Sequence, residues 1–266
     1  MIAAAGLDAV FARTKSEKRA ALIMYMMAGY PDIQTSSLVL DAISHAGADL
    51  IELGIPYGDP LGDGPTIAAA GQRALEAGIT TDDALRLMSE SNARGNAPGL
   101  FFTYVNPISQ YGAARFARAA RTAGAIGAIV PDVPLEELEE FGPDFAAAGL
   151  GLPLLVAPST PPERAARIAD RSEGFVYLVS RLGVTGARRE PDFAWIEGAV
   201  GRLRAHSAKP IAVGFGLSRP EHVRRVGALA DGVIVGSALI DAIGDLRGPT
   251  AAGAAGEYVR SLRGAL

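Results

Sequence analysis

Eight short apolar runs, separated by segments with helical patterns, constrain the fold of this chain more than any other feature. Most of the runs lack an alternation of polar and apolar residues, which is typical of parallel strands that are covered on both faces. We therefore interpret them as buried parallel strands. They span residues 22–27, 50–53, 99–103, 126–130, 153–156, 175–179, 211–214 and 232–235.

The segments between these runs carry signals for helix starts. Asp32 precedes one helical pattern, and residues 1–20 are typical of a short amphipathic helix. Residues 160–163 (Thr-Pro-Pro-Glu) combine an N-cap, a proline at the first helical position and a capping-box acid, and residues 218–221 (Ser-Arg-Pro-Glu) repeat the arrangement. Four glutamates crowd the first turns of a further helix, where the helix dipole favours negative charge; they are Glu136, Glu137, Glu139 and Glu140.

Eight strands alternating with helices over 266 residues predict an α/β chain, a (β/α)8 TIM barrel with an extra N-terminal helix. The competing architecture is an open doubly wound sheet, which usually has fewer strands and a glycine-rich nucleotide turn after the first. Residues 28–31 (Ala-Gly-Tyr-Pro) make no such turn. Since the chain shows no internal repeat, low-complexity linker or charge block, we expect one domain over residues 1–266.

The amino-acid composition excludes several kinds of functional site. The chain has no cysteine, which excludes disulfides, thiolate metal sites and cysteine nucleophiles, and its three histidines are widely spaced, so we expect no metal site. The net charge of −4 gives no reason to expect nucleic-acid binding. No apolar run approaches the ~20 residues of a membrane span, and the N-terminal segment lacks the unbroken apolar stretch of a signal peptide. We expect a cytoplasmic protein.

One carboxylate interrupts the second apolar run. Glu52 lies within Leu-Ile-Glu-Leu, and Asp59 and Asp63 follow in a loop rich in glycine and proline. An apolar setting raises the pKa of a carboxyl group, whereas a loop rich in backbone amides keeps one ionised. Two acids in such different settings suit acid–base chemistry. From these residues alone, a structural ion pair is an equally good interpretation of Glu52, and Asp59 and Asp63 would more often be turn residues.

Residues 52–65, Glu-Leu-Gly-Ile-Pro-Tyr-Gly-Asp-Pro-Leu-Gly-Asp-Gly-Pro, resemble the signature of the tryptophan synthase α chain family. That signature usually reads Glu-Leu-Gly-Val-Pro-Phe-Ser-Asp-Pro-Leu-Ala-Asp-Gly-Pro, so Tyr57, Gly58 and Gly62 depart from it. The resemblance extends from about Tyr25 to Ser237 and includes Asn-Pro at 106–107 and Pro-Asp-Val-Pro at 131–134.

The resemblance implies a carbon–carbon lyase that splits indole-3-glycerol phosphate into indole and glyceraldehyde 3-phosphate, a retro-aldol reaction without a cofactor in this chain. By match of position, Glu52 protonates indole C3 and helps to remove the proton of the glycerol hydroxyl. Asp63 accepts the indole N–H and stabilises positive charge on the ring. These roles are expectations from the family pattern.

Three late glycine turns fit a phosphate site. They occupy residues 183–186, 214–216 and 236–237, after the sixth, seventh and eighth runs. Glycines let backbone amides approach an anion, and barrels commonly bind phosphate after strands seven and eight. The resemblance extends through these turns, and the expected phosphate contacts are Gly186, Gly216, Gly236 and Ser237.

The family pattern implies further site residues. Tyr177 supports Glu52, and Thr185 positions Asp63 from a loop that closes over substrate. A buried tyrosine bonded to nearby backbone is an equally good account of Tyr177 from the residues alone. The expected walls of the indole pocket are Tyr25, Phe102, Ile129 and Phe215, although any one of them would also suit the barrel core.

The resemblance also implies a partner, a β chain that carries pyridoxal phosphate (PLP) and receives the indole. The two kinds of chain would form an α2β2 heterotetramer. The expected docking residues at the rim are Asp59, Pro60, Asn106 and Pro134. Alternatives are a stand-alone lyase that releases indole, and a catalytically weak barrel that acts as an allosteric partner. Another phosphate-sugar barrel, such as an isomerase, would explain the glycine turns but not the carboxylate run.

The departures from the signature predict a mobile loop. Glycine gives up more backbone freedom than other residues when it is ordered. Gly58 and Gly62 should therefore loosen the loop that carries Asp63, which predicts a low basal rate and a greater need for a partner.

Overall fold

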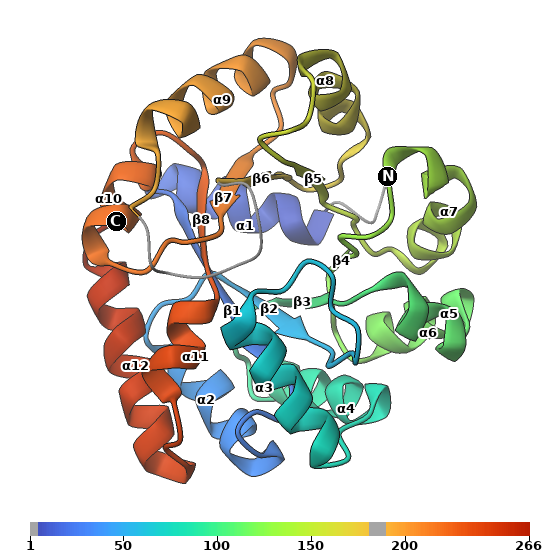
Figure 1. Cartoon of the computed structure of the whole chain (residues 1–266), viewed down its shortest axis with the longest axis vertical. Coiled ribbons are helices and arrows are strands. Elements are labelled where there is room, and N and C mark those ends of the chain that lie inside the picture. The colour runs from blue at the N-terminus through green and yellow to red at the C-terminus, as the bar shows by residue number, and fades with distance from the viewer. Residues whose placement is uncertain (1–4, 181–189) are drawn as a thin grey trace.

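The computed structural model describes residues 5–180 and 190–266. Their eight strands form one parallel sheet in the order β4-β3-β2-β1-β8-β7-β6-β5, at the centre of Figure 1. The strands are β1 (Ala21–Met27), β2 (Leu50–Gly54), β3 (Gly99–Phe102), β4 (Ala128–Ile129), β5 (Leu154–Val156), β6 (Val176–Val179), β7 (Ile211–Gly214) and β8 (Gly232–Val235). All eight predicted strands are present, although β4 is shorter than residues 126–130.

An isolated parallel bridge between Gly127 and Gly151 joins the two ends of this order. Across it, the amide of Ala128 donates to the carbonyl of Gly151 at 2.9 Å. A β-carbon at Gly127 would lie 2.6 Å from that same carbonyl oxygen, so this approach of the two backbones requires glycine. The bridge nearly closes the sheet into a barrel, which confirms the predicted (β/α)8 fold.

Helices surround the strands in a ring (Figure 1). They are α1 (Ala5–Ser16), α2 (Ile33–His45), α3 (Pro65–Glu76), α4 (Thr81–Ala93), α5 (Val105–Tyr111), α6 (Ala113–Thr122), α7 (Leu138–Ala148), α8 (Pro162–Arg171), α9 (Phe193–His206), α10 (Pro220–Gly227), α11 (Ser237–Ile243) and α12 (Gly248–Arg263), with a 3-10 turn at Leu135–Glu137. Helix α1 is the predicted extra helix. Its fully buried Leu7 packs against Gly127, Gly151 and Gly174, beside the bridge between β4 and β5.

Some of the predicted helix starts are confirmed and two are corrected. Glu139 and Glu140 lie in the first turn of α7, and Glu136 and Glu137 lie in the 3-10 turn before it. Asp32 caps α2, and its carboxylate accepts from the amide of Thr35 at 2.7 Å. The capping boxes predicted at 160–163 and 218–221 are wrong, because α8 and α10 begin after Pro161 and Arg219 without a side-chain cap. Each of these N-cap residues precedes a proline, which holds it extended and moves the helix start one residue on.

The amino-terminal end of the barrel holds a buried ion cluster. Asp49 is 3% exposed and accepts from both terminal guanidinium nitrogens of Arg19, at 2.6 and 2.8 Å. Its carboxylate also accepts from the amide of Leu22 and from Arg13. Because the active sites of such barrels lie at the opposite, carboxyl-terminal end of the strands, we assign the cluster to the fold rather than to a reaction.

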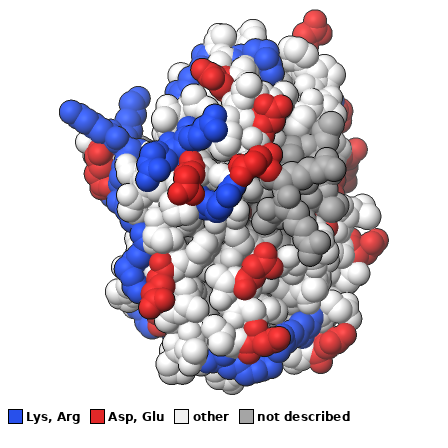
Figure 2. Space-filling model, turned by 60° about the vertical axis from the view of Figure 1, so that its left-hand side comes forward, with Lys and Arg blue, Asp and Glu red and all other residues white. Residues whose placement is uncertain are grey.

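Charged residues are mixed in sign on the face shown in Figure 2, where Lys and Arg side chains lie among Asp and Glu. Within residues 5–180 and 190–266, no helix has the length and apolar character needed to cross a membrane. No group of three or more potential metal-binding side chains occurs in this part of the chain.

Candidate active site

Glu52 lies inside the barrel wall, on β2 and in register with Tyr25 of β1 and Leu100 of β3. The residue is 1% exposed, and among the described residues its Oε1 has no hydrogen-bond partner. The structural ion pair considered from sequence is not found for Glu52 in the described part of the chain. Burial raises the pKa of Glu52 from 4.5 to about 8, so the carboxyl group holds its proton at neutral pH.

Asp63 lies in the loop between β2 and α3. Its Oδ1 accepts from the hydroxyl of Tyr104 at 3.0 Å, and the same hydroxyl accepts from the amide of Gly62 at 3.0 Å. Burial raises the pKa of Asp63 to about 6, and the bond from Tyr104 opposes that rise. The pKa of Asp63 is thus higher than the polar loop predicts, because the side chain is buried; at pH 7 it remains largely ionised.

The two acids line one pocket, with about 460 Å³ of empty space, near the carboxyl ends of the strands. The pocket brings together most of the residues predicted from sequence. Its walls are Tyr25, Glu52, Asp63, Ile67, Phe102, Tyr177, Phe215, Gly216, Leu217, Ile234, Gly236 and Ser237.

Three predicted residues are not among these walls. Ile129 is fully buried in the core and is not among the residues that line this pocket, so its assignment stays a prediction. Ile129 is in register with Phe102, but only Phe102 lines the pocket. Because the strands of a barrel are tilted, residues that are hydrogen-bonded neighbours lie at different heights along the barrel axis. Thr185 and Gly186 lie outside the described residues.

Aromatic rings form two walls of the pocket. Tyr25 meets Phe102 edge to face at 5.7 Å between ring centroids, and Tyr177 meets Phe215 likewise at 6.0 Å. Burial raises the pKa values of both tyrosines well above their ordinary range, and the nearby Glu52 adds to the effect, so both hydroxyls stay protonated. The result is an apolar slot of a kind that suits a planar aromatic ligand.

Turns after β7 and β8 also line the pocket. Phe215 has a φ of 76° and Gly216 a φ of 77°, so two successive residues are left-handed. This conformation is costly for a phenylalanine and is typical of functional sites. The hydroxyl of Ser180 donates to the carbonyl of Phe215 and holds the turn. Gly236 and Ser237 lie at the start of α11, on the same pocket.

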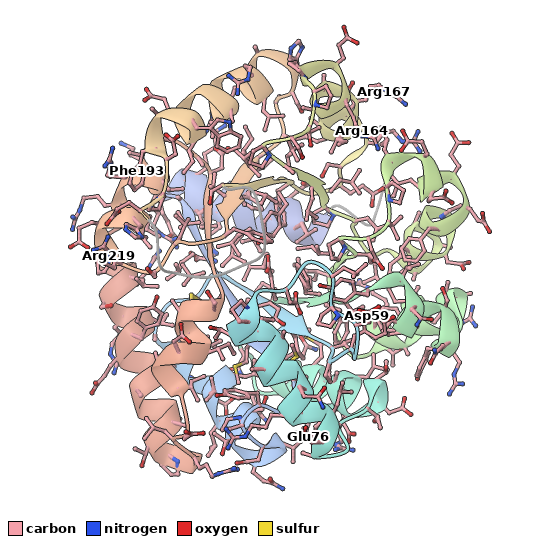
Figure 3. All side chains as sticks on the ribbon, in the orientation of Figure 1. Asp59, Glu76, Arg164, Arg167, Phe193 and Arg219 are labelled. Carbon is pink, nitrogen blue, oxygen red and sulfur yellow. The ribbon has the colours of Figure 1, made fainter. Side chains whose placement is uncertain are left out.

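The predicted docking residues lie at the surface around this mouth. Asp59, labelled in Figure 3, Asn106 and Pro134 are exposed, and Pro60 is half-buried. Their neighbour Leu61 is 75% exposed, the most exposed of the large hydrophobic side chains described. These residues therefore form a solvent-facing rim beside Asp63.

Sequence reasoning missed four residues of the site. Ile67, Leu217 and Ile234 are apolar pocket walls that nothing in their sequence context distinguishes from core. Tyr104 had a usable signal. It follows the third apolar run, at the same carboxyl-terminal edge as Asp63, and is a hydrogen-bonding residue in that position.

Comparisons with known proteins agree with this geometry. A family model described as tryptophan synthase alpha chain matches residues 11–261. The tryptophan synthase alpha chain of Prochlorococcus marinus (strain MIT 9313) is 45% identical over 262 residues, covering 98% of this chain and 95% of that protein. The Arabidopsis thaliana tryptophan synthase alpha chain is 41% identical over 245 residues, which cover 92% of this chain and 89% of that protein. A structure of Mycobacterium tuberculosis tryptophan synthase has a TM-score of 0.88 at 38% identity and covers 97% of this chain and 98% of the compared chain. The chain belongs to the tryptophan synthase alpha chain family.

Proposed function

We propose that this chain is a lyase that cleaves indole-3-glycerol phosphate into indole and glyceraldehyde 3-phosphate, with Glu52 and Asp63 as its catalytic residues. The observation that carries the proposal is the pairing, in one pocket, of a buried carboxyl group that is protonated at neutral pH with a second one that is largely ionised. Environments that separate two pKa values in this way assign acid and base roles.

The steps balance on these two side chains. The Glu52 carboxylic acid gives its proton to C3 of the indole ring, and the ring nitrogen takes up the positive charge. The Asp63 carboxylate accepts the indole N–H and stabilises that charge. The Glu52 carboxylate then removes the proton of the glycerol hydroxyl, the bond between C3 and the glycerol carbon breaks, and its electrons return to the ring. Glu52 ends protonated, as it began.

The rest of the pocket suits the two ends of the substrate. The rings of Tyr25 and Phe102 would flank the indole, and Tyr177 would hold Glu52 in dry surroundings. Gly216, Gly236 and Ser237 would bind the phosphate through backbone amides and a hydroxyl, together with Gly186. The left-handed turn at Phe215 and Gly216 supports this role because Gly216, which carries no side chain, lines the pocket there.

The family name implies a beta-chain partner. We propose that the rim residues Asp59, Pro60, Asn106 and Pro134 dock it in a cytoplasmic α2β2 assembly, with PLP in the partner and no cofactor in this chain. Leu61 within that rim is 75% exposed, and removing its apolar surface from water on docking would favour the complex.

The decisive experiment is an indole-release assay on the purified chain, with and without a beta chain. We expect Glu52→Gln to abolish indole formation, because glutamine keeps the volume but cannot deliver a proton, and to leave binding of glycerol phosphate nearly intact. Glu76→Gln, on the exposed residue labelled in Figure 3, is the matched control.

Full activity in Glu52→Gln would reject the mechanism. Turnover that is equally fast with and without the beta chain would favour the stand-alone lyase. Indole release too slow to measure in either condition would favour the allosteric binding module, although the presence of both Glu52 and Asp63 argues against it.

A further inference from the structure

A second tyrosine, Tyr57, stands between the two catalytic acids in the sequence and lies beside Tyr104 in the structure. The ring centroids of Tyr57 and Tyr104 are 5.4 Å apart, with 37° between the ring planes. The hydroxyl of Tyr57 accepts a hydrogen bond from Nδ2 of Asn106 at 3.0 Å. Tyr57 is thus attached both to the end of β3 and to the first turn of α5.

Gly62 and Asp63, farther along the same loop, also bind to Tyr104. The Tyr104 hydroxyl accepts from the amide of Gly62 and donates to the carboxylate of Asp63, each at 3.0 Å. Residues 57 and 62–63 of the loop therefore both bind to residues 104–106, and a continuous set of contacts leads from Asn106 to the catalytic carboxylate.

The element that receives the loop is itself fixed. The amide of Val105, the first residue of α5, donates to both carboxylate oxygens of Asp132, at 2.9 and 3.2 Å. Asp132 follows β4, so the start of α5 is held by the neighbouring strand's loop. Asn106 consequently offers a firm anchor rather than a flexible one.

The hydroxyl of Tyr57 is a departure of this chain from the family signature, in which the corresponding residue is phenylalanine. A phenylalanine would keep the ring contact with Tyr104 but would lose the bond from Asn106. The same loop carries Gly58 and Gly62, which make it costly to order. The extra hydrogen bond offsets part of that cost.

We propose that Tyr57 is a positioning residue whose hydroxyl, held by Asn106, fixes the loop so that Tyr104 stays bonded to Asp63 before any partner binds. The proposal rests on the catalytic role of Asp63 proposed above. It implies that the isolated chain has a better ordered Asp63 than its two loop glycines alone would allow.

The test compares Tyr57→Phe with wild type in partner-free indole formation. Loss of one neutral hydrogen bond predicts a fall in kcat of about two- to tenfold with little change in KM, because Asp63 acts mainly in the transition state. Tyr111→Phe is the matched control. It removes the hydroxyl of Tyr111, the last residue of α5, which donates to Asp82 at 2.8 Å, away from the pocket.

Hydrogen exchange supplies a readout that does not depend on activity. We expect the Gly62 amide to exchange several-fold faster in Tyr57→Phe and at the wild-type rate in Tyr111→Phe, with the thermal midpoints of the two variants alike. The double variant Tyr57→Phe/Asn106→Ala should lose no more activity than either single variant, because both remove the same bond.

The outcomes separate the two proposals. A wild-type chain that forms no indole rejects the proposed function, and Gly62 exchange then still decides whether Tyr57 holds the loop. An active wild type with unchanged kcat and unchanged Gly62 exchange in Tyr57→Phe overturns the positioning role. A lower thermal midpoint with unchanged Gly62 exchange also overturns it, since Tyr57 would then serve stability alone.

Discussion

Tyr25 lies across Gly54, and its hydroxyl oxygen would overlap a β-carbon on Gly54. Tyr177 lies across Gly214 in the same manner. Glycines at the ends of β2 and β7 thus make room for two tyrosine rings beside Glu52. The rings help to cover the carboxyl group, and burial is the cause of its raised pKa.

Gly54→Ala tests this arrangement. The added methyl group must displace the Tyr25 ring, so we expect kcat/KM for indole formation to fall by at least about tenfold and the stability to fall by ~1–3 kcal/mol. Gly142→Ala in α7 is the control, since its β-carbon meets nothing within 4 Å. Steady-state kinetics and urea unfolding measure both effects, and a fully active Gly54→Ala variant would contradict the account.

The pH dependence of kcat/KM follows from the two acids. Asp63 must be ionised, so the rate should rise through its pKa of about 6. Glu52 must carry a proton, so the rate should fall through its pKa of about 8. We expect a bell-shaped profile with its maximum near pH 7. A profile that stays flat from pH 6 to pH 9 would exclude these two groups as the titrating pair.

Glu52→Gln should stabilise the protein at high pH. Because the folded state binds the Glu52 proton more tightly than the unfolded state, stability is present below pH 4.5 and is lost as pH rises toward about 8. At about 1.4 kcal/mol per pKa unit, the loss approaches ~5 kcal/mol as an upper bound. Urea unfolding of wild type and Glu52→Gln at pH 5 and pH 9 measures the difference in stability between them. A stability difference that does not grow with pH would show that Glu52 is solvated.

Tyr104→Phe should move the acid limb of the pH profile. The Tyr104 hydroxyl lowers the pKa of Asp63 by donating to it, so its removal raises that pKa above about 6. We expect activity at pH 6 to fall more than activity at pH 7.5, with the basic limb unchanged. Measurement of kcat/KM over a pH series for wild type, Tyr104→Phe and the control Tyr111→Phe tests this. An acid limb that does not move in Tyr104→Phe would show that the hydrogen bond does not affect the pKa of Asp63.

The two loop glycines should respond differently to the family residues. Gly58→Ser places a β-carbon at an ordinary 4.0 Å from Leu75, so ordering the loop should raise the basal rate. A β-carbon at Gly62 would lie 3.2 Å from the Tyr104 hydroxyl, so Gly62→Ala must shift that group and should gain less. Partner-free rates of the single variants measure this, and equal gains would show that the contact with Tyr104 is unimportant.

Much of the fold could be predicted, because uninterrupted apolar runs identify parallel strands even without an alignment. The runs at 211–214 and 232–235 match β7 and β8 in full. The site was predictable where a residue is chemically unusual for its position, as with Glu52 in a strand. Ile129 could not be placed from sequence in the same way, because an isoleucine carries no sign of how deep in the barrel it lies. Tyr104 was missed because its importance depends on a contact between loops far apart in sequence.

Leu7 packs against three glycines that follow it far along the chain, beside the seam between β4 and β5. A nascent polypeptide makes α1 first, yet the surface that receives its leucine is complete only once Gly174 has been synthesised. Late contacts of this kind slow folding. During translation, Leu7 therefore lacks part of its final packing until Gly174 has been made, and apolar surface exposed in this way favours aggregation of an incomplete chain.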